Sequence, residues 1–264
     1  MGKKRGRKRQ RQLNMAVATI QRRFGPRALF QGTPATTRGD PAAVPVISTG
    51  FPALDRVLGI GGLPRGKICE LVGPATSGKT TLALKFLAEA QTGGGEVVYI
   101  DQALYFDPDY AYRCGLALSR LLVGTTHDLQ EALAMTEALA RSGGPVAMVF
   151  DALEFLWTDA AAASLLAATL NRLPGFLART GLTLLVLHES PPGDVPGGGS
   201  PALSALAHAA SIRLQVARER WLRRHHDVRG YEARVAVLKN RLGPAGRSAR
   251  IEIEFNGTVR GMDL

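Results

Sequence analysis

The sequence predicts an α/β fold with a mostly parallel central sheet, flanked by helices and extended by antiparallel strands. Short apolar runs alternate with helical patterns between residues 67 and 189. Such near-continuous apolar strands are typical of a parallel sheet that helices cover on both faces. After a Gly- and Pro-rich loop at residues 190–200, two long segments alternate in polarity around a basic connection. They predict an antiparallel hairpin added to that sheet.

The residues before the core are predicted to form three segments. Residues 1–13 contain seven basic residues and no acidic one, which predicts a disordered basic arm. Residues 14–30 have apolar side chains four positions apart and are expected to form a helix that docks on this domain or on a neighbouring subunit. Residues 31–45 are rich in Thr, Pro, Ala and Gly, as linkers are. The core is therefore expected over residues 46–264.

Within the core, apolar runs and helical periodicity predict the elements. The expected strands are Lys67–Val72, Glu96–Asp101, Leu121–Thr125, Val146–Asp151, Leu182–Glu189, Ser211–Leu222, Gly230–Lys239 and Arg250–Phe255. The expected helices are Thr80–Thr92, Pro108–Cys114, Asp128–Arg141 and Asp159–Thr180. Pro174 is expected to kink or break the last helix, because proline removes a backbone hydrogen bond.

Composition narrows the class of protein. The chain has 264 residues, 45% of them hydrophobic, which predicts a domain with a substantial core. Cys69 and Cys114 lack metal or disulfide spacing and are interpreted as buried residues of a reduced compartment. Apolar runs fall short of the ~20 residues of a membrane span, and the N-terminus lacks the apolar segment of a secretory signal. We therefore expect a cytoplasmic location and no membrane partner.

The segment Gly73–Thr80 matches the pattern G-x-x-x-x-G-K-[ST] between an apolar strand and a helical pattern. Its glycines let backbone N–H groups converge on phosphate oxygens, and the following helix adds the positive end of its dipole. Lys79 is expected to contact the β- and γ-phosphates, and the Thr80 hydroxyl to ligate Mg²⁺. The predicted nucleotide-binding residues are Gly73, Pro74, Ala75, Thr76, Ser77, Gly78, Lys79, Thr80 and Thr81.

Asp151 ends an apolar strand that follows the phosphate-binding loop in the chain. An acidic residue at that position is expected to hold Mg²⁺ through water, although a capping role is the alternative. Asp101 ends the neighbouring predicted strand and is a second acidic candidate close to the same site.

The net charge of +11 predicts a polyanionic partner. The candidate nucleic-acid contacts are Lys3, Lys4, Arg5, Arg7, Lys8 and Arg9 in the arm, and Arg218, Arg220, Arg223 and Arg224 in the hairpin. Contacts of this kind would be independent of sequence and sensitive to salt. The alternative for the hairpin arginines is a solvated edge that deters edge-to-edge pairing.

Several segments recur together, in this order, in RecA-type recombinases. They are Ile47–Gly50, Leu58–Ile68, Gly73–Leu82, Tyr99–Asp101, Asp107–Ala111 and Arg234–Arg241. The chain thus resembles that family over roughly residues 14–262, and its helix ending at Gly25 resembles the arm that links RecA subunits. The resemblance implies a RecA-like P-loop ATPase core with ATP bound between the subunits of a filament on single-stranded DNA.

The resemblance also implies roles for individual residues. The adenine contacts of the family fall on Asp107 and Tyr110, and its Walker B aspartate falls on Asp151. The basic pair that reaches the γ-phosphate of the neighbouring subunit falls on Lys239 and Arg241. There they would stabilise charge in the transition state, which makes them candidate catalytic residues together with Lys79.

The sequence departs from the family at the catalytic positions. Where the family has a catalytic glutamate, this chain has Ala103, which cannot orient or deprotonate an attacking water. The Asn-Gln pair that acts as a polar sensor is replaced by His188 and Glu189. Glu189 is therefore a candidate substitute base, although a carboxylate near the γ-phosphate also repels it.

Further departures concern DNA contacts. The first DNA-binding loop of the family is expected to be absent before the helix at Asp159, and the second is shortened to Ser190–Ser200, without Lys or Arg. The large C-terminal domain of RecA is also expected to be missing. The basic arm and the hairpin therefore remain as the surfaces predicted to contact phosphates.

Two functions follow from these observations. The first is a RecA-like, slow DNA-dependent ATPase of recombination and repair. The second is a non-catalytic accessory protein of the ImuA type, which would use ATP as a structural switch in the DNA-damage (SOS) response or in translesion synthesis beside a repair polymerase. A general P-loop kinase or transport ATPase is disfavoured by the Arg234–Arg241 strand.

Overall fold

The computed structural model describes residues 2–25, 28–29, 44–151, 160–189, 201–224, 227–255 and 259–261. The chain divides into two compact units, residues 1–43 and residues 44–264, which are described separately. The two loops expected to differ from the DNA-binding loops of RecA, and most of the expected linker, lie outside the described residues.

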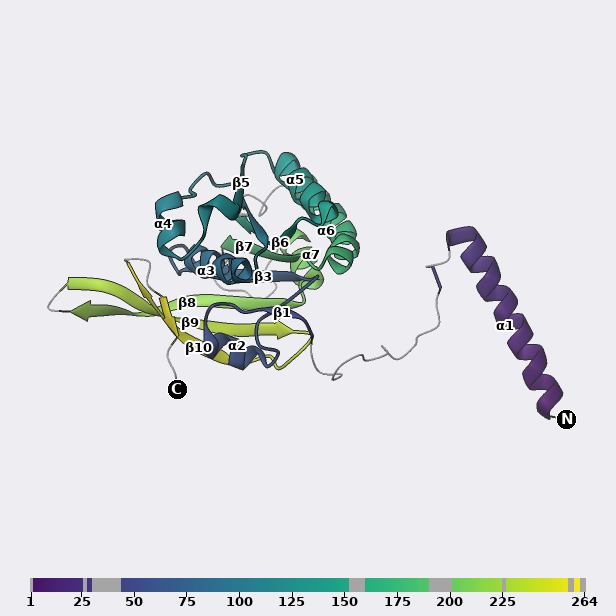
Figure 1. Cartoon of the computed structure of the whole chain (residues 1–264). Helices are drawn as coiled ribbons and strands as arrows, with labels where there is room; N and C mark the ends of the chain where they lie inside the picture. Colours follow the sequence, from purple (N-terminus) through teal and green to yellow (C-terminus); the bar gives the residue numbers. More distant parts are fainter. Residues whose placement is uncertain are drawn as a thin grey trace. The chain divides into compact units, whose positions relative to one another are not determined.

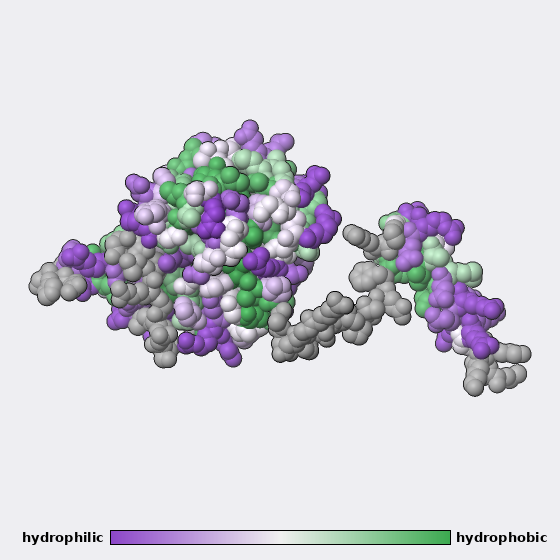
Figure 2. Space-filling view, viewed as in Figure 1, coloured by the Kyte–Doolittle hydropathy of each residue, from purple (hydrophilic) through white to green (hydrophobic). Residues whose placement is uncertain are grey.

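The first unit contains the helix α1 (Gly2–Phe24; Figure 1). The expectation of a disordered arm over residues 1–13 is wrong, because the helix begins at Gly2 rather than near residue 14. Lys, Arg and Gln are good helix formers, and no proline interrupts this stretch, so the basic residues continue the helix. Apolar side chains toward its C-terminal end are exposed (Figure 2), among them Leu13, Met15 and Phe24.

The second unit is built on one sheet, whose described strands run in the order β11-β10-β9-β8-β3-β7-β6-β4-β5. The parallel strands are β3 (Ile68–Gly73), β4 (Glu96–Asp101), β5 (Leu121–Thr125), β6 (Pro145–Asp151) and β7 (Thr183–Glu189). Strand β8 (Ile212–Arg224) pairs parallel to β3, and the antiparallel strands β9 (Asp227–Asn240), β10 (Ser248–Glu254) and β11 (Val259–Gly261) follow it. The predicted fold class is confirmed.

Helices cover both faces of this sheet (Figure 1). One apolar core joins the sheet to α2 (Pro52–Leu58) and α3 (Lys79–Thr92). The other core joins it to α5 (Leu129–Ser142), α6 (Ala160–Thr180) and α7 (Pro201–Ala209). The short helix α4 (Pro108–Arg113) follows β4, and β1 (Val46–Ile47) pairs with β2 (Leu63–Pro64) in a separate small sheet.

Some elements differ from the expectation. Helix α6 continues through Pro174, whose side chain lies on the exposed side, where water can satisfy the carbonyl that loses its partner. Helix α2 was not expected, although it has helix signals: Pro52 in its first turn and Gly59 at its C-cap with φ of 72°. Helix α7 and strand β11 were also not expected. Both are short; α7 packs on the sheet through the second core, and β11 pairs antiparallel with β10 at the edge of the sheet.

None of the described helices is both long enough and apolar enough to cross a membrane.

We predict that Leu87→Ala lowers the free energy of unfolding by about 2–5 kcal/mol, because it leaves a cavity in a packed core. Leu87 lies on α3 and is fully buried. Chemical denaturation would measure the change. The matched control is Leu122→Ala on the edge strand β5, where the side chain is 52% exposed and the cost should stay below about 1 kcal/mol. Equal costs for the two variants would contradict this description of the core.

Candidate functional site

The loop between β3 and α3 has no room for side chains at two glycines. A Cβ on Gly73 would lie 2.3 Å from the carbonyl oxygen of Val216 on β8. Gly78 has a φ of 104°, and a Cβ there would lie 2.6 Å from Cδ1 of Ile253. Gly73 is therefore required by close packing against backbone, and Gly78 by its left-handed backbone conformation.

The side chain of Lys79 folds back over this loop. Its Nζ donates to the carbonyl oxygens of Gly73 at 3.0 Å and Pro74 at 2.9 Å. The carboxylate of Glu189, at the end of the adjacent strand β7, lies 3.8 Å from the same nitrogen. The structure thus brings the predicted base candidate Glu189 to the predicted phosphate-binding lysine.

Thr80 and Asp151 are also brought together. The Thr80 hydroxyl donates to Oδ2 of Asp151 at 3.3 Å, and the Tyr99 hydroxyl donates to the same oxygen. Burial raises the pKa of Asp151 and the charge of Asp101 adds to this, although the hydrogen bond from Tyr99 acts in the opposite direction. A carboxylate whose charge is disfavoured in this way would be stabilised by a nearby cation.

Asp101 has a different role from the one considered in the sequence. Its two carboxylate oxygens accept backbone N–H groups of Tyr105 at 3.2 Å and Phe106 at 2.8 Å. It therefore holds the turn that follows β4. That turn also contains Ala103, at the position where the resemblance places a catalytic glutamate.

The loop residues fit a phosphate group together with a hard cation. The hydroxyl oxygen of Ser77 is buried and has no hydrogen-bond partner among the described residues. The described residues also contain no cluster of three His, Cys, Asp or Glu side chains that could hold a metal by themselves. The pair Thr80 and Asp151 therefore fits Mg²⁺, which commonly takes its remaining ligands from phosphates and water.

A cavity of about 470 Å³ opens beside this loop. It is lined by Thr76, Ser77, Gly78, Lys79, Thr80, Thr81, Tyr110, Arg218, Trp221, Tyr231, Ile253 and Phe255. Tyr110, a predicted adenine contact, lies in this lining, and its hydroxyl is 2.7 Å from the Thr81 hydroxyl oxygen. Asp107 is not part of the lining; it caps α4 by accepting the backbone N–H of Tyr110 at 3.0 Å. Asp107 thus positions the helix that carries Tyr110.

Two aromatic residues of the hairpin and Phe255, which directly follows β10, form one wall of the cavity. The ring of Trp221 contacts the rings of Tyr231 and Phe255 edge-on, at centroid distances of 5.9 and 6.3 Å. The guanidinium of Arg218 lies 4.2 Å from the Trp221 ring centre, a cation–π contact. Burial raises the pKa of Tyr231 to about 12, so its phenol is neutral at physiological pH.

The sequence did not predict that these aromatic residues would line the site. The hairpin and the strand of Phe255 were predicted, but their aromatic residues are distant in sequence from the phosphate loop. Only the pairing of β8 with β3 brings them beside it.

Two of the four predicted basic residues of the hairpin, Arg218 and Arg220, make contacts within the chain. Arg218 faces the cavity, and Arg220 forms an ion pair with Glu232 at 2.7 Å. Arg223 is exposed, and the side chain of Arg224 lies outside the described residues. On α1, the side chains of Arg7, Lys8 and Arg9 are exposed, while those of Lys3, Lys4 and Arg5 lie outside the described residues.

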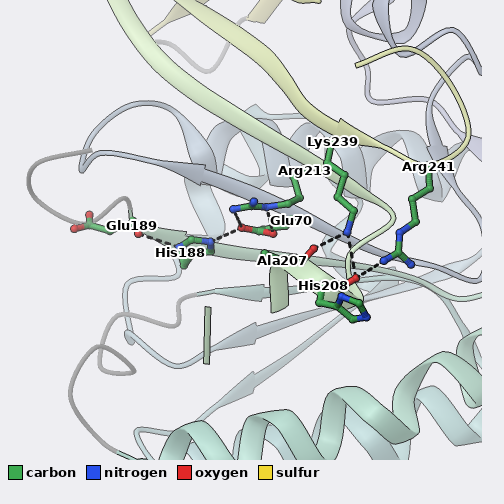
Figure 3. Close-up of polar contacts among 8 residues, drawn as sticks. All are labelled: Glu70, His188, Glu189, Ala207, His208, Arg213, Lys239 and Arg241. Atoms are coloured by element: carbon green, nitrogen blue, oxygen red, sulfur yellow. Dashed lines mark hydrogen bonds and ion pairs between the residues drawn. The ribbon is translucent and has the colours of Figure 1, made fainter. Parts of the chain in front are cut away.

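Lys239 and Arg241 are not in the lining of the cavity beside the phosphate loop of their own chain. The Lys239 ammonium donates to the carbonyl oxygens of Ala207 at 2.6 Å and His208 at 3.1 Å, and Arg241 donates to His208 at 2.6 Å (Figure 3). These carbonyls belong to the last turn of α7, where cations are favoured. In the sheet, Lys239 lies near the end of β9 and Arg241 follows that strand. Lys239 pairs with Arg213 of β8, which in turn pairs with Glu70 in the first half of β3, whereas the phosphate loop follows the end of β3.

The comparisons with known proteins agree on one family. The RecA N-terminal domain family matches residues 11–260. Protein RecA of Chlorobaculum tepidum is 34% identical to this chain, over 93% of the chain and 75% of that protein. Protein RecA of Acidiphilium cryptum is 33% identical, over 92% of the chain and 75% of that protein. The crystal structure of the RadB recombinase matches 83% of this chain and 100% of its own, with a TM-score of 0.66 and 21% identity, a likeness of fold.

We predict that Tyr99→Phe lowers the free energy of unfolding by about 1–3 kcal/mol at neutral pH, because it removes a donor from a buried carboxylate. Since the hydrogen bond from Tyr99 lowers the pKa of Asp151, the loss should shrink as the pH falls and Asp151 becomes neutral. Denaturation at several pH values would measure it. Tyr105→Phe, with a side chain that is 84% exposed, is the control and should be near neutral. A loss that does not depend on pH would contradict the assignment to Asp151.

Proposed function

Because the chain belongs to the RecA N-terminal domain family, we propose that it is an ATP-binding and DNA-binding protein of recombination and repair that hydrolyses ATP slowly. The observation that carries the proposal is the phosphate loop itself. Two glycines that tolerate no Cβ, the folded-back Lys79 and the unpartnered buried hydroxyl of Ser77 form a cradle that suits a polyphosphate.

In this proposal, the backbone of Gly73–Gly78 binds phosphate oxygens through its N–H groups. Lys79 exchanges its contacts with the loop carbonyls for the β- and γ-phosphates, and Thr80 and Asp151 hold Mg²⁺. The bound Mg²⁺ would supply positive charge that neutralises the phosphate oxygens. The proximity of Thr80 and Asp151, 3.3 Å between their oxygens, supports this pairing.

The base of the nucleotide would occupy the cavity beside the loop. Tyr110 offers one aromatic surface, and the wall of Trp221, Tyr231 and Phe255 offers another. Aromatic surfaces facing a common cavity suit a planar heterocycle, because offset and edge-on ring contacts are favourable. Asp107 would contribute indirectly, since its carboxylate caps the helix of Tyr110.

Hydrolysis would be slow because Ala103 provides no carboxylate at the position of the catalytic glutamate. Glu189 is the proposed substitute base, since its carboxylate lies 3.8 Å from Lys79. A base that is paired with the phosphate-binding lysine has to exchange partners before it can activate water. This arrangement suits a slow ATPase better than a fast one.

Lys239 and Arg241 are proposed to act on the site of a neighbouring copy. Their separation from the phosphate loop of their own chain supports an action in trans, and it implies a homo-oligomer or filament. In such an assembly these cations would leave the carbonyls of α7 and stabilise charge that develops on the transferred phosphate.

The second candidate is the accessory protein of the ImuA type, in which ATP is bound but not hydrolysed. Ala103 favours this candidate. In the first candidate function, by contrast, single-stranded DNA would be contacted through the basic helix α1, where Arg7, Lys8 and Arg9 are exposed. A repair polymerase would be the partner in this second case only.

We predict that the protein binds ATP with Mg²⁺, that single-stranded DNA stimulates its ATP turnover, and that Lys79→Ala lowers ATP affinity by at least about tenfold. Calorimetry and a phosphate-release assay would measure these effects. Lys85→Ala, on the same helix but outside the cavity lining, is the matched control. Tight binding without any turnover would favour the switch function, and unchanged affinity in Lys79→Ala would contradict the site.

A mixture of Lys79→Ala and Lys239→Ala chains is predicted to recover part of the turnover that each variant lacks alone. A site formed by the intact loop of one chain and the intact Lys239 of the other would again be complete. Turnover measured across mixing ratios, with each variant shown to be folded by circular dichroism, tests this. Absence of recovery at every ratio would argue against a shared site.

A further inference from the structure

A buried group of charged residues lies across three neighbouring strands, next to the phosphate loop but outside it (Figure 3). Glu70 on β3 is fully buried, and His188 on β7 is 2% exposed. Arg213 on β8 is directly opposite Glu70 in the sheet. Charged residues are almost never buried unless they are paired. The hydrogen-bond partners of Glu70 and His188 therefore indicate whether each side chain is charged.

Every contact of Glu70 in this group requires it to accept hydrogen bonds. Arg213 donates to both of its oxygens, at 2.6 and 3.0 Å. Nε2 of His188 lies 2.8 Å from Oε1. Burial alone would raise the pKa of Glu70, but the hydrogen bonds and charges of His188 and Arg213 lower it below its ordinary value. Glu70 is therefore an ionised carboxylate.

The other ring nitrogen of His188 also faces an acceptor. Nδ1 lies 2.9 Å from the backbone carbonyl oxygen of Glu189. A neutral imidazole has one donor nitrogen and one acceptor nitrogen, whereas an imidazolium has two donors. A carboxylate and a carbonyl have no proton to donate, so both nitrogens of His188 need their own hydrogen.

We propose that His188 is held as an imidazolium between Glu70 and the Glu189 carbonyl, and that it is a positioning residue for the phosphate site. The cation fixes the backbone from which the Glu189 side chain reaches Lys79, 3.8 Å away. The consequence for ligand binding rests on the proposed function, namely that the loop at Gly73–Thr80 binds nucleotide.

If His188 lacked one ring hydrogen, one of its two hydrogen bonds would be replaced by a repulsive contact. In that contact, a nitrogen lone pair would face a lone pair of an oxygen. The Glu189 carbonyl is the weaker acceptor of the two, so that contact is the one released. The positive charge near the phosphate loop falls at the same time. Both effects would weaken the binding of a polyphosphate, which is the direction that tests the proposal.

Other charged groups surround His188 and set the background. Lys79 faces Glu189 from α3, and Lys239 on β9 interacts electrostatically with Glu70 and Arg213. Arg241 lies two residues after Lys239. Helix α7 contacts Lys239 and Arg241 through backbone carbonyl oxygens. These cations disfavour a positive charge on His188. The hydrogen bonds to Glu70 and to the Glu189 carbonyl stabilise that charge.

Nitrogen NMR of histidine-labelled protein tests the protonation state directly. The chain has five histidines, and the signals of His188 are those missing from His188→Asn. We expect both ring nitrogens of His188 to carry a hydrogen in the parent protein. Glu70→Gln should convert the ring to a neutral tautomer. A neutral ring in the parent protein would overturn the proposal.

The affinity for ADP with Mg²⁺ tests the positioning role. Glu70→Gln should bind ADP at least about threefold more weakly than the parent protein, because the neutral ring no longer holds the Glu189 carbonyl. Thermal unfolding would show that the variant is folded. An unchanged affinity in a variant whose ring is neutral would overturn the role. Lys79→Ala separates the two proposals, because it removes nucleotide affinity and leaves the NMR signature of His188 intact.

Discussion

Strand β3 is hydrogen-bonded along both of its edges, to β7 on one side and to β8 on the other. This double pairing is the constraint on which the candidate site depends. It places the end of β7, with Glu189, beside the loop that follows Gly73, and it brings the backbone of Val216 so close that position 73 has no room for a side chain. The loop is shaped by its neighbours as much as by its own glycines.

The same constraint explains how charge is distributed around the loop. Lys79 is satisfied by carbonyls of the loop and by Glu189, and Asp151 by the hydroxyls of Thr80 and Tyr99. In the proposed function, each of these contacts would be exchanged for a phosphate or a cation without leaving a buried charge unpaired, which would otherwise be costly.

The hairpin β8–β9 connects two regions with different chemistry. Near its tip, Arg218 and Trp221 face the cavity beside the phosphate loop. At its other end, Lys239 binds the carbonyls that close α7. Arg213, which is directly opposite Lys239 in the hairpin, is paired with the buried Glu70. One element therefore joins the cavity, the charged cluster and the cations proposed to act on a neighbouring copy.

The sequence by itself determined the fold class, the order of the main strands and helices, and the phosphate loop, because these depend on apolar periodicity and on a local motif whose spacing carries its chemistry. It also identified Thr80, Asp151 and Tyr110, which the structure brings around that loop. Only the tertiary structure decided what depends on strand pairing: the aromatic wall, the capping roles of Asp101 and Asp107, and the contacts of Glu70 with His188 and Arg213. The partners in these contacts are separated by up to 143 positions in the chain, and no local pattern records which strands will lie side by side.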